Sequence, residues 1–224
     1  MWPRKRPSFG LDSDRAVRLY DRFLKKAPKQ SRSRSVVESV LSAATELLGR
    51  HDDEDEVTIQ AVAERAGVGV GSLYDYFVDR GSVFSGLAAK LTEDNLRRFE
   101  AELDATKDQP LEVAIRRAVD LLWNTYLADV RIPRIVLRIA HRTNLMPALS
   151  ANHELFGKTL ARSLRNRSDL DPAILADLEA ATYTITNMMM GVVGTLVFAE
   201  QRPFPDEVLK AECVRVCVRY LTPR

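Results

Sequence analysis

The sequence of 224 residues lacks several features of secreted and membrane proteins. Its only cysteines are Cys213 and Cys217, which excludes a disulfide framework and indicates a reducing cytoplasm. No stretch approaches the roughly 18 uncharged apolar residues of a membrane span. The opening residues, MWPRKRP, lack the apolar segment of a secretory signal. We therefore expect a soluble, cytoplasmic protein.

Patterns of catalytic and metal-binding residues are also missing. The three histidines, His51, His141 and His153, have no ligand spacing with one another or with the cysteines. The sequence contains no nucleophile elbow and no catalytic pair of carboxylates. It therefore predicts neither an enzyme, nor a metal site, nor a cofactor. Cys213 and Cys217 lie one helical turn apart and are expected to be buried thiols at an interface.

Charge is distributed unevenly along the chain. Residues 1–34 contain eleven Lys and Arg against three Asp, a net charge of +8, whereas the whole chain has a net charge of only +2. A basic arm on an acidic body indicates a polyanionic partner that is met at one end. The alternative is a solvated terminal tail.

Part of this arm has a helical pattern. Over residues 13–26, apolar side chains recur on one face and basic side chains on the other, and Pro28 ends the pattern. We expect an extra amphipathic helix, and we expect Lys29, Arg32 and Arg34, which lead into the next helix, to contact the polyanion. Such a helix either meets the polyanion or packs on its own body, and the sequence leaves both open.

Three short helices are predicted between residues 35 and 77. The first is capped by Ser35 with Glu38 and stopped by Gly49 in a left-handed conformation, and Thr58 caps the second. The second ends at Gly67, and the third must begin within about four residues because Leu73 and Phe77 lie one turn apart. Two helices joined by so tight a turn form a helix-turn-helix. The rival, a dinucleotide-binding loop, would need a glycine at Ser72 and a preceding strand.

The run TIQAVAERAGVGVGSLYDYFVDRGSVF resembles the DNA-binding signature of the TetR family of bacterial transcriptional regulators. The resemblance is specific from about Ser35 to Leu91. It implies that Thr58, Ser72, Tyr76 and Arg80 contact the DNA backbone. It implies that Gln60, Val70, Gly71, Tyr74 and Asp75 approach base edges.

The residues themselves are compatible with these roles. A helix N-terminus suits phosphate, and the phenols of Tyr74 and Tyr76 can donate to it. Val70 and Gly71 depart from the polar residue often found there, so base reading would lean on Gln60, Tyr74 and DNA shape. Asp75 either accepts from a cytosine amine or faces away.

The remainder is predicted to be all-α. A helix capped by Asp79 should run to about Leu103 and link two domains, and later helices should span about 110–129, 132–141, 152–167, 172–200 and 205–221. The last two are apolar around most of their circumference, which favours a two-fold dimer, as in the resembled family. The expected interface residues are Ile185, Met188, Val192, Leu196, Leu209, Cys213, Val216, Cys217 and Tyr220.

Aromatic and methionine residues in this region are candidates for an apolar ligand pocket, although core packing is the alternative for each. They are Trp123, Tyr126, Met146, Phe156, Tyr183 and Met189. We therefore expect three segments: a basic extension over 1–31, a helix-turn-helix domain over 32–80, and a helical ligand-binding and dimerisation domain over 81–224. The predicted function is a regulator, released from a palindromic operator by a small apolar effector. The alternatives are an effector-independent architectural DNA binder and, more remotely, a nucleotide-binding enzyme.

Overall fold

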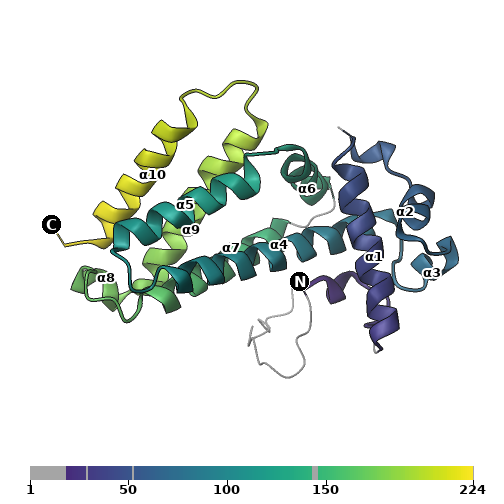
Figure 1. Cartoon of the computed structure of the whole chain (residues 1–224), viewed down its shortest axis with the longest axis horizontal. Coiled ribbons are helices and arrows are strands. Elements are labelled where there is room, and N and C mark those ends of the chain that lie inside the picture. The colour runs from purple at the N-terminus through teal and green to yellow at the C-terminus, as the bar shows by residue number, and fades with distance from the viewer. Residues whose placement is uncertain (1–18, 29, 52, 143–145, 224) are drawn as a thin grey trace, which may run out of the picture.

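The computed structural model describes residues 19–28, 30–51, 53–142 and 146–223, and these residues form helices without any strand. This confirms the predicted all-α class. Figure 1 shows a smaller lobe around α1, α2 and α3, a larger lobe around α5 and α7 to α10, and the long helix α4 running between them. The smaller lobe contains η1 (Leu19–Phe23), α1 (Ser31–Leu48), η2 (Glu54–Glu56), α2 (Ile59–Ala66) and α3 (Val70–Tyr74). The other helices are α4 (Arg80–Ala105), α5 (Leu111–Tyr126), α6 (Arg131–Arg142), α7 (Met146–Leu164), α8 (Pro172–Ala176), α9 (Leu178–Phe198) and α10 (Asp206–Leu221).

Local capping explains where α1 and α4 begin. Helix α4 starts as predicted, because the Asp79 carboxylate accepts from the Ser82 N–H at 2.7 Å. The predicted cap of α1 at Ser35 is wrong, because the cap is Gln30, five residues earlier, and Ser35 lies inside the helix. There the Ser33 hydroxyl accepts from the Gln30 N–H at 3.2 Å and donates to the Gln30 carbonyl at 2.8 Å. The predicted left-handed stop at Gly49 is wrong, since Gly49 keeps a right-handed φ of −69°.

The helix predicted over residues 172–200 is two helices in the structure. The backbone of Asp177, with φ −135° and ψ 50°, is not helical and separates α8 from α9. Aspartate has a low propensity for a helix interior, which favours a break there, and its side chain forms no capping hydrogen bond with α9.

Two hydrophobic cores lie at the two ends of α4. The N-terminal end of α4 supplies Phe84 and Leu87 to the core of the smaller lobe, and its C-terminal end supplies Leu103 to the core of the larger lobe. Helix α6 was assigned from the sequence to the larger domain, yet its Ile135 and Ile139 are buried in the smaller lobe's core. Helix α6 therefore contacts both lobes.

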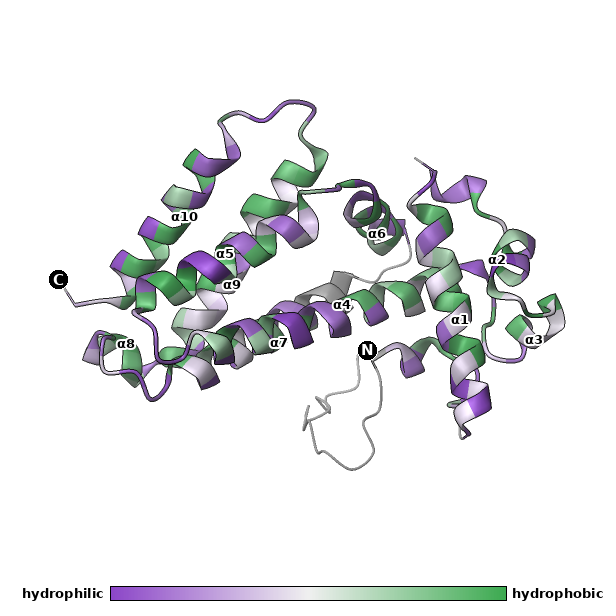
Figure 2. Cartoon of the chain, viewed as in Figure 1, coloured by the Kyte–Doolittle hydropathy of each residue, from purple (hydrophilic) through white to green (hydrophobic). Residues whose placement is uncertain are grey.

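Apolar residues occupy much of α9, as its predominantly hydrophobic colour shows (Figure 2). By length and composition α9 could cross a membrane, so the expectation that no stretch approaches a membrane span is wrong. The core helices of soluble proteins pass the same test. Here α9 packs against α5 and α7, and Val193 and Val197 are buried in the larger lobe.

Candidate nucleic-acid interface

The turn between α2 and α3 has the geometry that its glycine predicted. Gly67 has φ +68°, a left-handed conformation that glycine adopts without steric cost. Leu73 and Phe77 are fully buried as predicted, but α3 ends at Tyr74, so Phe77 lies in the segment after the helix and not within it. Two short helices joined by this turn form the predicted helix-turn-helix at the end of the molecule farthest from α8 and α10 (Figure 1).

Most of the side chains expected to meet DNA lie on the outer surface of these two helices. Tyr74 is 42% exposed, and Val70 and Tyr76 are half-buried. The others on this surface are exposed: Thr58, Gln60, Gly71, Ser72 and Asp75. The Thr58 hydroxyl accepts from the Ala61 N–H at 3.1 Å and so caps α2. Its own hydrogen stays available for a phosphate oxygen.

Arg80 and Arg34 are engaged within the chain. The Arg80 guanidinium forms an ion pair with Asp55, and its hydrogen bond lowers the pKa of that carboxyl below the ordinary range. Arg34 donates to the Pro28 carbonyl at 3.3 Å and lies 3.9 Å from the Asp21 carboxylate. Arg32 is exposed, whereas Lys29 lies outside the described residues.

The described part of the basic extension packs against the rest of its own chain. The described part of the helix predicted over residues 13–26 is the short 3-10 helix η1. Residues 13–18 lie outside the described part of the chain. Tyr20 is buried, and its hydroxyl donates to Glu38 at 3.2 Å. Phe23 lies against Gly86 of α4. The extension is thus built into the smaller lobe.

The same packing brings two lysines beside α3 that were not among the predicted DNA contacts. The Lys25 ammonium donates to the Tyr74 carbonyl at 2.8 Å. The Lys26 ammonium lies over the Tyr76 ring, 5.1 Å from its centroid. The charged face of residues 13–26 included both lysines, but only the tertiary structure shows which helix they meet.

Comparison with known proteins agrees with this geometry. Residues 40–86 match the model described as bacterial regulatory proteins, tetR family, and residues 110–221 match the tetracyclin repressor-like C-terminal domain. The two matches together span both lobes. The chain belongs to the TetR family.

Two crystal structures share the fold of this TetR-family protein at low sequence identity. One is a protein from Mesorhizobium loti described as a TetR-family transcriptional regulator, with a TM-score of 0.64, 15% identity, and coverage of 85% of this chain and 95% of that chain. The other is the TetR family repressor AlkX from Dietzia sp., implicated in biodegradation of n-alkanes, with a TM-score of 0.57, 17% identity, and coverage of 83% and 98%. No curated protein matched the sequence. TetR-family members are DNA-binding regulators rather than enzymes, so this chain is a transcriptional regulator of that family.

The C-terminal domain of this TetR-family chain contains a small apolar cavity of about 80 Å³. Three of the predicted pocket residues, Tyr126, Phe156 and Met189, line it, together with residues of α4 such as Asn95 and Phe99. The Asn95 amide donates to the Tyr126 hydroxyl at 3.4 Å, and burial raises the pKa of Tyr126 above its ordinary value.

The other predicted pocket residues lie away from this cavity or outside the described side chains. Trp123 is buried in the core, outside the residues that line the cavity. Tyr183 is 46% exposed and lies in a surface groove with Glu154 and Lys158. The side chain of Met146 lies outside the described part of the structure. Helical periodicity in the sequence does not distinguish a side chain that lines a cavity from one that lies in the core or in a surface groove, so the sequence could not separate these positions.

The predicted interface residues divide into three groups, which are buried, partly buried and exposed in the single chain. Ile185, Leu196, Cys213 and Cys217 are buried in the core of the single chain, so that core already covers side chains that were expected to meet a second subunit. Val192 and Leu209 pack partly against the same core. Met188, Val216 and Tyr220 are exposed by 37%, 46% and 45%, and stay available to a partner.

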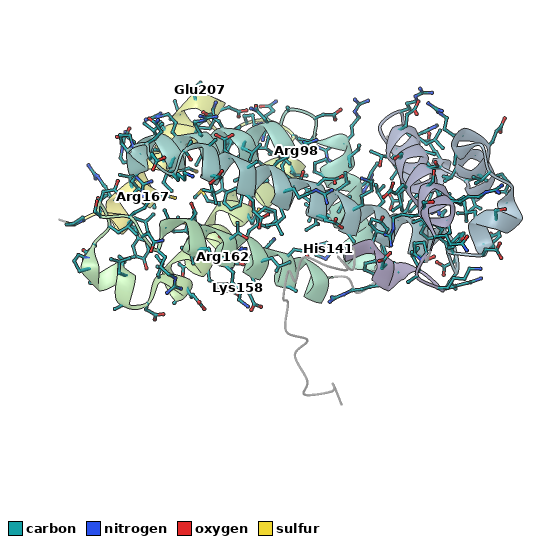
Figure 3. The ribbon with its side chains drawn as sticks, turned by 60° about the horizontal axis from the view of Figure 1, so that its bottom comes forward. Arg98, His141, Lys158, Arg162, Arg167 and Glu207 are labelled. Carbon is teal, nitrogen blue, oxygen red and sulfur yellow. The ribbon has the colours of Figure 1, made fainter. Side chains whose placement is uncertain are left out.

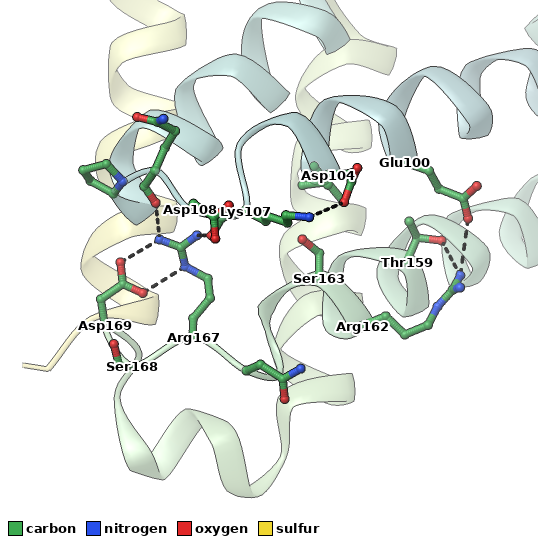
Figure 4. Close-up of a pocket in the computed structure, with 14 residues that line it drawn as sticks. Glu100, Asp104, Lys107, Asp108, Thr159, Arg162, Ser163, Arg167, Ser168 and Asp169 are labelled. Atoms are coloured by element: carbon green, nitrogen blue, oxygen red, sulfur yellow. Dashed lines mark hydrogen bonds and ion pairs between the residues drawn. The ribbon is translucent and has the colours of Figure 1, made fainter.

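A larger groove of about 940 Å³ lies between the C-terminal ends of α4 and α7 and the loops that follow them, and most of its lining residues are polar (Figure 4). At its centre Arg167 pairs with Asp169 at 2.7 Å and donates to the carbonyls of Lys107 and Gln109. Arg162 reaches Glu100 at 3.4 Å and Thr159 at 3.2 Å. The Arg167 contacts join the loop after α7 to the loop after α4, and the charged side chains make this groove a poorer candidate for an apolar effector than the apolar cavity.

Proposed function

We propose that this TetR-family chain is a cytoplasmic repressor that binds an inverted-repeat operator as a homodimer and leaves it when a small, largely apolar effector binds. The observation that supports this most is the exposed polar surface of the helix-turn-helix, carried at one end of the molecule. Its hydroxyls and phenols are suited to phosphates, and Gly71 allows a close approach to the groove.

Dimer formation is proposed through α9 and α10. Met188 on α9 and Val216 and Tyr220 on α10 are exposed side chains that a second copy can cover. A Cβ built at Gly191 or Gly194 meets open space within the single chain, so another helix can approach closely there. Because operator symmetry mirrors protein symmetry, a two-fold dimer should select an inverted repeat with half-sites about 34 Å apart.

Effector binding is proposed at the apolar cavity. Its volume of about 80 Å³ is well below the ~300 Å³ of a typical ligand site. An effector must therefore displace its lining, and Met189 and Met190 are adaptable enough to move. Asn95 and Phe99 place α4 in the cavity wall, and Phe99 packs on Phe156 with ring centroids 5.5 Å apart.

Movement of α4 would change the distance between the two recognition helices of a dimer. Helix α6 offers a second connection, because Ile135 and Ile139 are buried in the DNA-binding lobe while Arg134 donates to the Val197 carbonyl of α9 at 2.8 Å. An effector that favours the displaced form would lower DNA affinity, with a coupling of typically about 1 to 3 kcal/mol.

Selection of binding sites from a random duplex pool tests the DNA-binding part of the proposal. We expect an inverted repeat, and enrichment of an unsymmetric half-site, or none, would contradict it. Tyr76→Phe should weaken binding to all sequences alike, whereas Gln60→Ala and Tyr74→Ala should also change the selected bases. Identical sites for Tyr74→Ala and the parent would remove Tyr74 from the base-reading set.

A thermal-shift screen of small apolar compounds tests the effector part. Each compound that stabilises the protein should bind more weakly when operator DNA is present, because linkage is reciprocal. The small volume of the cavity favours a second candidate, an architectural DNA binder without an effector. That candidate predicts no stabilising compound, or compounds whose affinity DNA leaves unchanged.

A further inference from the structure

The recognition helix α3 is short and ends close to the basic extension. It has five residues, and the turn that follows uses two of its carbonyls, since Asp75 N–H donates to Gly71 and Phe77 N–H donates to Leu73. The carbonyls at the end of a helix have no partner within the helix and carry a partial negative charge. Something outside the helix must satisfy them.

Lys25 of the extension supplies one hydrogen bond to the last carbonyl of α3 and one to the turn that follows it. Its ammonium donates to the Tyr74 carbonyl at 2.8 Å, and its backbone N–H donates to the Tyr76 carbonyl at 2.7 Å. A cation at a helix C-terminus is also stabilised by the helix dipole. The two residues held in this way carry the phenols that we expect to meet DNA.

The segment around Lys25 is itself fixed to the lobe. Tyr20 is 1% exposed and bonded to Glu38 of α1, Leu24 packs on the core, and Asp21 lies 3.9 Å from Arg34. The lysine therefore reaches α3 from a position held by buried contacts, which is how a supporting residue keeps a reading helix in place. The adjacent Lys26 ammonium is exposed and lies over the Tyr76 ring.

We propose that the extension is part of the DNA-reading surface, with Lys25 as a positioning residue that fixes the C-terminal end of α3 and Lys26 as an additional phosphate contact beside Tyr76. The proposal rests on the DNA-binding function proposed above. Lys25 acts through Tyr74 and so governs how well bases are distinguished. Lys26 adds charge and so strengthens binding to any duplex.

Two methionine variants separate these roles, because each removes one ammonium and keeps the length of the side chain. Lys25→Met should lower affinity for the selected operator about tenfold while changing affinity for unrelated duplex much less, and Lys25→Arg should restore most of it. Lys26→Met should weaken both duplexes equally and reduce the slope of log affinity against log salt by about 1.8 per dimer. Lys158→Met, in the larger lobe away from α3, is the control and should change neither (Figure 3).

Hydrogen exchange without DNA tests the capping role independently. The amides of Asp75, Tyr76 and Phe77 should exchange faster in Lys25→Met than in the parent or in Lys26→Met, since the end of α3 loses a fixed partner. Unchanged exchange would overturn the positioning role of Lys25. This result does not depend on operator selection, whereas a parent protein that selects no operator would refute the DNA-binding function itself. Equal loss of operator and unrelated-duplex binding in Lys25→Met would show that Lys25 provides charge only. An unchanged slope of log affinity against log salt in Lys26→Met would show that Lys26 does not contact a phosphate.

Discussion

Replacing Glu54 by glutamine should loosen the connection between the two lobes. The Glu54 side chain is only 2% exposed and lies in η2 of the smaller lobe. Its Oε1 accepts from Arg142 at 2.9 Å, and its Oε2 lies 3.5 Å from Arg138, both on α6. Glutamine has the same shape but no charge, so it weakens both contacts without opening a cavity.

The expected loss in the free energy of unfolding depends on how far the two arginine side chains are exposed to solvent. Removing one member of a fully buried ion pair costs about 3 to 5 kcal/mol. Here the side chains of Arg142 and Arg138 are 60% and 34% exposed, so they can turn to solvent once the carboxylate is gone. The loss should then be closer to that of a charge-assisted hydrogen bond, about 1.5 to 3 kcal/mol. For a chain of this length, that corresponds to a Tm lower by roughly 3 to 10 °C.

Thermal unfolding followed by circular dichroism measures this shift, and Glu56→Gln is the matched control. Glu56 is two residues away, its side chain is 58% exposed, and it lies 2.7 Å from His51. An exposed pair of this kind contributes about 0 to 1 kcal/mol. A double-mutant cycle with Arg142→Gln should give a coupling of about 1 kcal/mol. Equal shifts for Glu54→Gln and Glu56→Gln would refute the reasoning.

Three further predictions follow from particular contacts. Asp79→Ala removes the cap of α4 and should lower the free energy of unfolding by about 1 kcal/mol in urea titrations, whereas Asp79→Ser, which can still cap, should cost less; equal losses would exclude capping as the cause. Met188→Glu combined with Val216→Glu should convert a dimer to monomer in light scattering, whereas Val113→Glu, 38% exposed on α5, should not; a dimer that survives would place the interface elsewhere. Burial raises the pKa of the Cys217 thiol to about 12 and raises that of Cys213, so neither should react with iodoacetamide at pH 8 until the protein unfolds. Because the unfolded thiols lose their protons first, stability should also fall as pH rises from about 9 to 12, and rapid alkylation of the native protein would contradict the burial.

Local patterns in the sequence determined the helix-turn-helix. Gly67 allowed the left-handed turn, and the spacing of Leu73 and Phe77 fixed which side of α3 and of the turn after it is buried. The cap at Asp79 likewise set the start of α4. These features depend on residues within a few positions of one another, where backbone sterics, capping and periodicity act directly.

Tertiary structure decided which surfaces cover one another. The apolar faces of α9 and α10 predicted burial, but the sequence could not tell that Cys213 and Cys217 are covered by their own chain while Val216 and Tyr220 are left exposed. It could not place Ile135 and Ile139 of α6 in the core of the opposite lobe. Nor could it place Lys25 against α3, 49 positions further along the chain. Periodicity reports that a face is apolar or charged, whereas its partner is set by packing between segments that are distant in sequence.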